Sequence, residues 1–130
     1  MLEILEECGG RVVADDQCTG LRNFQPPSGE GRDAIERLID RYMNRSPCPA
    51  RSRATDRAAL LARLVERSQA RAVVFVFQKF CTPHLADHPF LVADLKKRGI
   101  PNTMTETDET GANDGQLSTR FEAFFEVLRA

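Results

Sequence analysis

The sequence predicts an α/β domain in which helices cover a small parallel sheet, in the Rossmann or flavodoxin-like manner. Residues Ala72–Phe77 form an unbroken apolar run rich in β-branched and aromatic side chains, as expected of a strand buried on both faces. Two weaker strand patterns, Arg11–Asp16 and Ile100–Thr107, lie before and after it, and helical patterns separate the three. Strands that alternate with helices form parallel sheets, so this order predicts the fold class.

Length and composition fit one domain of this class, spanning residues 1–130. The chain is 42% hydrophobic and 28% charged, and its 130 residues suffice for one core. The net charge of −1 argues against a protein that neutralises phosphate backbones, so we expect no nucleic-acid partner. No apolar run approaches the roughly 18 residues of a membrane span, and the acidic start MLEILEECGG does not resemble a secretion signal. We therefore expect a cytoplasmic protein without a membrane partner.

The chain is expected to begin with a helix. Leu2–Cys8 carries apolar side chains at roughly helical spacing, and Gly9-Gly10 stops the helix before the short strand Arg11–Asp16. Doubly wound domains generally begin with a strand, so we expect this chain to lack its first strand and to be a truncated, split or partial product. The segment Gln17–Gly31 has the prolines and glycines of a long loop.

Two helices are expected in the middle of the chain. Arg32–Arg45 is clearly amphipathic, and its apolar stripe consists of Ile35, Leu38, Ile39, Tyr42 and Met43. The SPCPA segment ends this helix, because prolines cannot continue it. The next helix runs from Arg57 to Ala70, with Thr55 or Asp56 as its N-cap. Its buried stripe is expected to be Leu60, Leu61, Leu64 and Val65.

The last part of the chain predicts a helix, a strand and a second helix. Pro89 suits the first turn of a helix that runs to about Arg98. The strand Ile100–Thr107 follows. The final helix, Leu117–Leu128, has the best-formed apolar stripe, and Thr119 with Glu122 can make a capping box at its start.

The candidate chemistry lies in the segment KFCTPHLADH, directly after the central strand. Ligands of open α/β sheets bind at this carboxyl edge, where Cys81, His84 and His88 follow the strand. From its residue type, Cys81 is a buried inert thiol, a nucleophile with His84 as its base, or a ligand of a metal or cluster. A zinc pair of His84 and His88 requires one helix through both, and Pro83 and Pro89 oppose such a helix.

Other polar residues are expected near the same edge. Asp15, Asp16, Cys18, Thr19 and Arg22 follow the first strand, and Glu106, Asp108 and Glu109 follow the last one. A solvated connection is the alternative for the first group. Cys48 lies between two prolines, where it is either a presented thiol or a small buried residue. The four cysteines form no C-x-x-C pair, which disfavours a zinc ribbon, a thioredoxin motif and a disulfide framework.

Four stretches of the chain occur together in a recognisable order. They are EECGGRVVADDQCTGLR with SPCP, KFCTPHLADHPFL, RGIP before a strand ending in Glu106 and Asp108, and GQLSTRFEAFFEVL. Together they resemble the C-terminal domain of the benzoyl-CoA reductase and 2-hydroxyacyl-CoA (2-hydroxyglutaryl-CoA) dehydratase family. The similarity covers nearly all of the 130 residues.

The resemblance implies an anaerobic, oxygen-sensitive enzyme subunit that carries a [4Fe–4S] cluster. Such a subunit takes a low-potential electron from an ATP-hydrolysing activator protein and passes it to an acyl-CoA substrate. A ketyl-type radical at the thioester carbonyl then permits removal of a 2-hydroxyl group or reduction of an aromatic ring, so the enzyme is a lyase or an oxidoreductase. Within the family, the residue pattern KFCTPHLAD favours the branch that reduces aromatic rings. The family works as two related subunits, so a homologous second subunit is expected.

By this resemblance Cys81 is a metal ligand, because it matches the family cysteine that binds cluster iron from this domain. Cys48 matches a recurrent family position without an assigned ligand role, and Cys8 and Cys18 have no ligand role. The residues that match a family signature for positioning or subunit packing are Thr119, Arg120 and Glu122.

The chain also departs from the family pattern. Family subunits are considerably longer, and their other cluster cysteines lie in an N-terminal domain that this sequence does not contain. We therefore expect the partner to be an N-terminal domain or complementary subunit, and the isolated chain to hold no cluster. The competing hypotheses are a non-catalytic α/β partner-binding module or remnant and, third, a Cys-His hydrolase.

Overall fold

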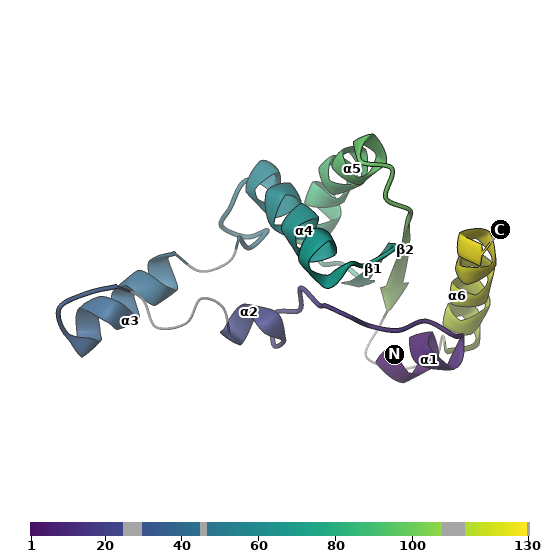
Figure 1. Ribbon diagram of the computed structural model, residues 1–130, viewed down its shortest axis with the longest axis horizontal. Helices are drawn as coiled ribbons and strands as arrows, with labels where there is room; N and C mark the ends of the chain where they lie inside the picture. Colours follow the sequence, from purple (N-terminus) through teal and green to yellow (C-terminus); the bar gives the residue numbers. More distant parts are fainter. Residues whose placement is uncertain (25–29, 45–46, 108–113, 130) are drawn as a thin grey trace.

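The computed structural model describes residues 1–24, 30–44, 47–107 and 114–129. Within these ranges two parallel strands form a small sheet, and helices cover both of its faces (Figure 1). In chain order the elements are α1 (Leu2–Glu7), α2 (Leu21–Phe24), α3 (Ala34–Met43), α4 (Ala54–Ser68), β1 (Val73–Gln78), α5 (Thr82–Lys97), β2 (Asn102–Thr107) and α6 (Asp114–Arg129). The predicted α/β class, a small parallel sheet covered by helices, is confirmed.

The sheet is built from the strand that the apolar run predicts and from its neighbour. β1 and β2 pair in parallel along their full length, from Val73 opposite Asn102 to Gln78 opposite Thr107, and α5 connects them. Side chains alternate between the two faces of a strand. β1 therefore contacts a core on each face, through Phe75 on one and Val74 on the other.

Two small cores hold the helices against the sheet. Phe75 and Phe77 of β1 with Leu91 and Leu95 of α5 form the buried centre of the first, and Leu5 of α1 with Leu117 and Phe121 of α6 form the second. α4 adds Ala58 and Leu61 to the first core as partly buried contacts. The final helix therefore buries its apolar stripe as predicted, and Phe121 has 0% of its surface exposed.

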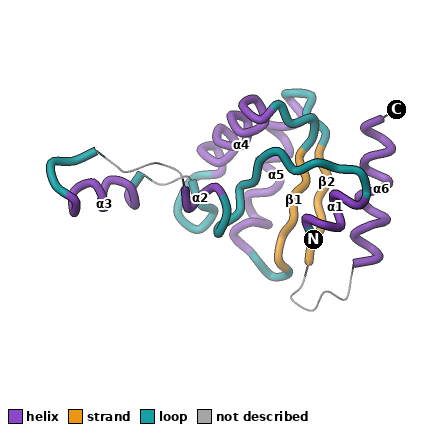
Figure 2. The backbone as a smooth tube through the Cα atoms, turned by 60° about the horizontal axis from the view of Figure 1, so that its bottom comes forward, coloured by secondary structure: helices purple, strands orange, loops and turns teal. Residues whose placement is uncertain are grey.

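The predicted strand Arg11–Asp16 is wrong, because the sheet of the described residues has only β1 and β2. Its apolar stretch is three residues long, and Val13 remains half exposed. So few inward-facing side chains do not hold a segment against a strand edge. The segment instead runs as a loop across the molecule (Figure 2), and the short helix α2 interrupts the loop predicted over Gln17–Gly31.

Helix α5 begins seven residues before Pro89, at Thr82, so the predicted break between the histidines is wrong. Pro83 lies in the first turn, where a helix needs no N–H donor. Pro89 lies inside the helix, at a cost of about 3 kcal/mol. Full burial of Leu91 and Leu95 offsets this cost, since each contributes about 1.5–3 kcal/mol.

Two predicted caps are also wrong. The N-cap of α4 is Arg53, without a side-chain cap, and Asp56 lies in the first turn as the exposed ion-pair partner of Arg53 at 3.4 Å. Helix α6 begins at Asp114, so Thr119 lies inside it and its hydroxyl donates to the Gly115 carbonyl at 3.0 Å. A capping box does not form there, because these helices begin earlier than their apolar stripes.

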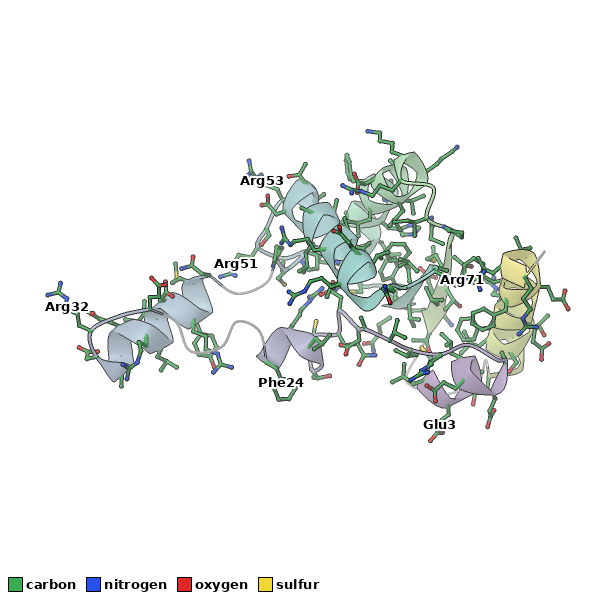
Figure 3. The ribbon with its side chains drawn as sticks, viewed as in Figure 1. Glu3, Phe24, Arg32, Arg51, Arg53 and Arg71 are labelled. Atoms are coloured by element: carbon green, nitrogen blue, oxygen red, sulfur yellow. The ribbon has the colours of Figure 1, made fainter. Side chains whose placement is uncertain are left out.

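Helix α3 forms where the amphipathic pattern predicts it, and Asp33 caps it by accepting from the backbone N–H groups of Ile35 and Glu36. Its apolar stripe is nevertheless exposed. The exposed fractions are 64% for Ile35, 49% for Leu38, 57% for Ile39, 55% for Tyr42 and 69% for Met43. In Figures 1 and 3, α3 lies apart from the sheet, with Arg32 at its far end.

No helix in the described ranges has both the length and the apolar character needed to cross a membrane.

Candidate functional site

Cys81 is the N-cap residue of α5, three residues after β1 ends. Its N–H donates to the Gln78 carbonyl at 3.0 Å, and its own carbonyl accepts from Leu85 at 3.1 Å. The side chain is partly exposed and makes no capping hydrogen bond. Backbone contacts therefore hold the residue at the carboxyl edge of the sheet, with its side chain partly exposed.

Phe80, directly before Cys81, has an unusual conformation. Its φ is +65°, in the left-handed region that costs a non-glycine residue about 1–2 kcal/mol. Its ring is 91% exposed, so no burial within the described chain repays this strain. Strained backbone of this kind clusters at functional sites, and here it directs a large aromatic side chain outward beside the thiol.

His84 lies in the first turn of α5 and is held by an arginine from another helix. Arg57, in the first turn of α4, has only 5% of its side chain exposed. Its Nη1 lies 3.0 Å from Asp87 Oδ2, and its Nη2 lies 3.4 Å from His84 Nδ1. Arg57 thus ties the first two turns of α5 to α4, close to Cys81 in the chain.

A second buried arginine, Arg22 of α2, joins this cluster and pairs with Asp16 in the loop before that helix. Arg22 makes a bidentate pair with Asp16, at 2.6 Å from Nε and 2.5 Å from Nη2. The same carboxylate lies 3.9 Å from Arg57 Nη2. Asp16 and Arg22 therefore come close to α5 through Arg57, although the strand that was expected to place them at this edge does not form.

We call Asp16, Arg22, Arg57, His84 and Asp87 the arginine cluster. Two buried guanidinium groups are costly to desolvate, and the two carboxylates compensate that cost only while the geometry stays intact. The hydrogen bond to Asp16 is the largest of the effects that raise the pKa of Arg22, against the opposing effect of burial. Arg22 therefore remains charged.

The other residues predicted beside this loop have smaller roles. Asp15 Oδ1 accepts from the N–H groups of Gln17 and Leu21 and so caps the turn into α2. Cys18 is exposed, with its sulfur 3.7 Å from Arg22 Nη1, and Thr19 is exposed.

Cys48 and Cys8 have structural surroundings. The N–H of Cys48 donates to the Ser52 hydroxyl at 3.2 Å, within the turn before α4, and its thiol is near enough to Arg22 to add to the raised pKa of that arginine. Cys8 borders the second core and its thiol donates to the Ser118 carbonyl at 3.6 Å.

The two histidines share α5, yet they face different surroundings. Burial lowers the pKa of both, and for His84 the charges of Arg57 and Arg22 lower it further. The His88 ring packs edge-on against Phe75 and Phe77, with centroids at 4.9 and 5.3 Å, and its buried Nε2 has no hydrogen-bond partner in the part of the chain that the structure describes. His88 is thus a packing residue, which removes it from the zinc pair.

A Cys-His nucleophile is also disfavoured. Nδ1 of His84 lies 3.4 Å from Arg57, which only donates hydrogen bonds, so this nitrogen is occupied and is not available as a base for Cys81. The ligand role of Cys81 stays a prediction at this point.

Comparison with known proteins decides the family. The family model of the 2-hydroxyglutaryl-CoA dehydratase D-component matches residues 1–128. This chain belongs to that dehydratase family. The family resemblance expected from the sequence is confirmed for the dehydratases, which are one of the two branches that the resemblance named.

Two curated relatives of the dehydratase family match almost the whole chain. YjiM of Escherichia coli (strain K12), which is named as a dehydratase subunit, is 31% identical over 129 residues, covering 98% of this chain and 33% of that protein. The lactoyl-CoA dehydratase subunit beta of Anaerotignum propionicum is 28% identical over 134 residues, covering 98% and 35%. The chain thus spans about a third of the length of these relatives.

The dehydratase-family chain does not form a complete metal site in its described ranges, where no three His, Cys, Asp or Glu side chains come together. One partly exposed thiol at a helix N-terminus suits one iron of a cluster, which normally takes about four protein ligands. The donor set of this chain therefore fits a shared cluster and does not fit a self-contained one.

A separate cavity of about 560 Å³ opens at the same edge of the sheet. It is lined by Lys79, Met104, Thr105, Glu106, Gln116, Leu117 and Arg120. Two predicted residues, Glu106 and Arg120, thus line it, whereas Glu122 is exposed on α6. Asp108 and Glu109, the rest of the predicted acidic group, lie outside the described residues.

The sequence interpretation missed Arg57 and Asp87. Arg57 appears only as the end of a basic stretch, and Asp87 as one polar residue among several. Their contact joins residues 30 positions apart on two helices, which no local spacing encodes. Burial of a charged side chain was the signal, and it appears only in three dimensions.

Proposed function

We propose that this chain is the part of a 2-hydroxyacyl-CoA dehydratase subunit that supplies one thiolate, Cys81, to a shared [4Fe–4S] cluster. The observation that carries the proposal is the position of Cys81, partly exposed at the start of α5 and at the ligand edge of the sheet, in a chain of this family. The remaining ligands would come from a complementary N-terminal domain or subunit.

Several features of the chain support a ligand role. The arginine cluster holds the first turns of α5, so Cys81 is presented by a rigid element. Phe80 is exposed beside it and would be covered by a partner that completes the site, excluding water from the metal. When bound, the cluster would supply single electrons at low potential, received from an ATP-hydrolysing activator protein and delivered to an acyl-CoA thioester.

Removal of a 2-hydroxyl group is the reaction that we now propose. The matched family model and both named relatives are dehydratases. The preference of the sequence interpretation for ring reduction has no support from them, and it stays as the competing outcome of an activity assay with 2-hydroxyacyl-CoA and aromatic acyl-CoA substrates under anaerobic conditions.

A chimera tests the proposed ligand. This chain would replace the matching region of YjiM, and the product would be reconstituted anaerobically with iron and sulfide. We expect a stable cluster absorption in the chimera, its loss in Cys81→Ala, and no change in the matched control Cys18→Ala. The isolated chain should hold no cluster. Iron that binds equally well without Cys81 would refute the ligand role.

A partner-binding module without catalysis is the second candidate, and the exposed apolar stripe of α3 favours it. Contiguous exposed apolar surface is typical of sites that contact another protein. A chimera that folds and assembles with its partner subunit but holds no iron in any variant would support this candidate over the cluster subunit.

A further inference from the structure

His84 combines two features that the dehydratase assignment does not explain. Its Nδ1 lies 3.4 Å from Nη2 of a buried arginine, and its Nε2 has no hydrogen-bond partner among the described residues. Nε2 of His88 is buried and unpaired within the described residues, whereas Nε2 of His84 is not buried in this way. One ring nitrogen is thus engaged inside the protein while the other is accessible.

The chemistry of Arg57 determines the protonation of this ring. A guanidinium carries only N–H donors and stays charged in proteins. The facing Nδ1 must therefore offer its lone pair, which leaves the single proton of the neutral ring on Nε2. The lowered pKa of His84, caused first by burial and then by Arg57 and Arg22, agrees with a neutral ring at neutral pH.

The position of His84 gives this proton a use. His84 is the third residue of α5 and Cys81 is its N-cap, and the side chains at these two positions lie at the same end of a helix, as in a capping box. Hydrogen bonds from N–H groups to cluster sulfur raise the reduction potential of a cluster, because the reduced form is the more negative one. A neutral Nε2–H provides such a donor, whereas the other tautomer would present a lone pair to sulfur.

We propose that Arg57 is a positioning residue that holds His84 as the neutral Nε2–H tautomer, so that His84 presents a hydrogen-bond donor beside the Cys81 site. The ligand class that this donor takes is sulfur, as thiolate or as cluster sulfide. The sulfur acceptor rests on the proposed function, whereas the tautomer follows from the contact with Arg57 alone.

The arrangement has a structural alternative. A guanidinium that only neutralised Asp16 and Asp87 would stabilise the fold through charge, and the tautomer of His84 would then be a matter of indifference. The two roles predict different results when Arg57 is replaced. If Arg57 sets the tautomer, Arg57→Lys should retain both the stability and the tautomer, because lysine keeps the charge and a donor, and Arg57→Met should lose both. If Arg57 acts only through its charge, the tautomer of His84 should not depend on the residue at position 57.

NMR of the isolated chain tests the tautomer without any metal. Long-range proton–nitrogen correlation spectra distinguish the two neutral tautomers, and the chain has only two histidines, which His88→Phe assigns. We expect His84 to be the Nε2–H tautomer at pH 7.5. We further expect Arg57→Met to mix the tautomers and raise the pKa of His84, and Arg57→Lys to restore the first state.

The controls keep this test decisive. Arg63→Met removes an exposed arginine from the same helix and should leave His84 unchanged. If Arg57→Met does not fold, the wild-type spectrum alone decides, because an Nδ1–H tautomer or a charged ring at pH 7.5 would overturn the proposal. The groups that act on this ring are Arg57, Arg22, Asp16 and Asp87, so the titration is also followed in Asp87→Asn.

The chimera tests the donor role. His84→Gln keeps an N–H near the position of Nε2, and His84→Phe removes it. We expect the reduction potential of the cluster to be unchanged in the first variant and lower in the second. An equal potential in both would overturn the donor role. Absence of a cluster from the wild-type chimera would instead overturn the proposed function and leave the tautomer result standing.

Discussion

Helices α6 and α3 each carry an apolar stripe, yet the two stripes end in opposite environments. Helix α6 buries Leu117 and Phe121 almost completely, whereas Ile35, Ile39 and Met43 of α3 each expose more than half of their surface. The difference lies in the neighbours, because α6 packs against β1 and α1 while α3 lies apart from both cores. Periodicity therefore shows which face of a helix is apolar and does not show whether the described chain covers it.

The largest effect on stability is expected in the second core. Phe121→Ala removes a side chain with 0% exposure and leaves a cavity between α6, α1 and β1. We expect the free energy of unfolding to fall by about 3–5 kcal/mol, measured by urea denaturation followed by circular dichroism. A loss below about 1 kcal/mol would mean that α6 is as weakly packed as α3.

A somewhat smaller loss is expected at the arginine cluster. Arg57→Met leaves Asp87 without its buried partner, which should lower the free energy of unfolding by about 3 kcal/mol. Arg63→Met, from the exposed side of α4, is the matched control and should change it little. Equal stability of the two variants would show that the cluster contributes nothing to holding α4 against α5.

The pH dependence of stability is expected to come from the two histidines of α5 and not from α3. The pKa values of His84 and His88 lie below their usual 6.5 in the folded state. The unfolded chain therefore binds more protons in this window, so stability is full above pH 6.5 and falls as the pH drops below it. His88→Phe should reduce this loss in pH-dependent urea denaturation. A stability that rises on acidification would contradict the assigned direction of both shifts.

The smallest effect is expected on α3. Ile39→Ala removes a side chain that is already 57% exposed, so the free energy of unfolding should change by at most about 0.5 kcal/mol. Leu95→Ala, from a position with 1% exposure, is the control of similar chemistry and should cost several times more. If both variants lost the same stability, the apolar stripe of α3 would be covered in solution.

Much of the fold could be predicted because its signals are local. The apolar run of β1, the stripe of α6 and the Gly-bounded α1 follow from residue type and spacing within one element. The errors arise where contacts between elements decide the outcome. Helix α5 forms through Pro89 because burial of Leu91 and Leu95 outweighs the cost of the proline. Arg11–Asp16 is not a strand because it pairs with no strand edge in the described residues.

The candidate site was also predicted only in part, and for the same reason. The position of Cys81 at the carboxyl edge followed from the order of strands and loops, whereas Asp16 and Arg22 approach α5 without the strand expected before them. The contact between Arg57 and His84 could not be predicted, because it joins two helices through side chains 27 positions apart. A pattern in the sequence cannot state which buried charge meets which acceptor.

Residue type and spacing were enough to predict the α/β class, the central strand, the amphipathic helices and the placement of Cys81 after β1. These depend on hydrophobic periodicity and on turn residues, which act over a few positions of the chain. Three outcomes depended on the folded molecule: the two histidines share a helix, buried arginines hold this helix, and α3 keeps its apolar stripe exposed. Burial and desolvation decide such outcomes, and both depend on every neighbour that a side chain meets.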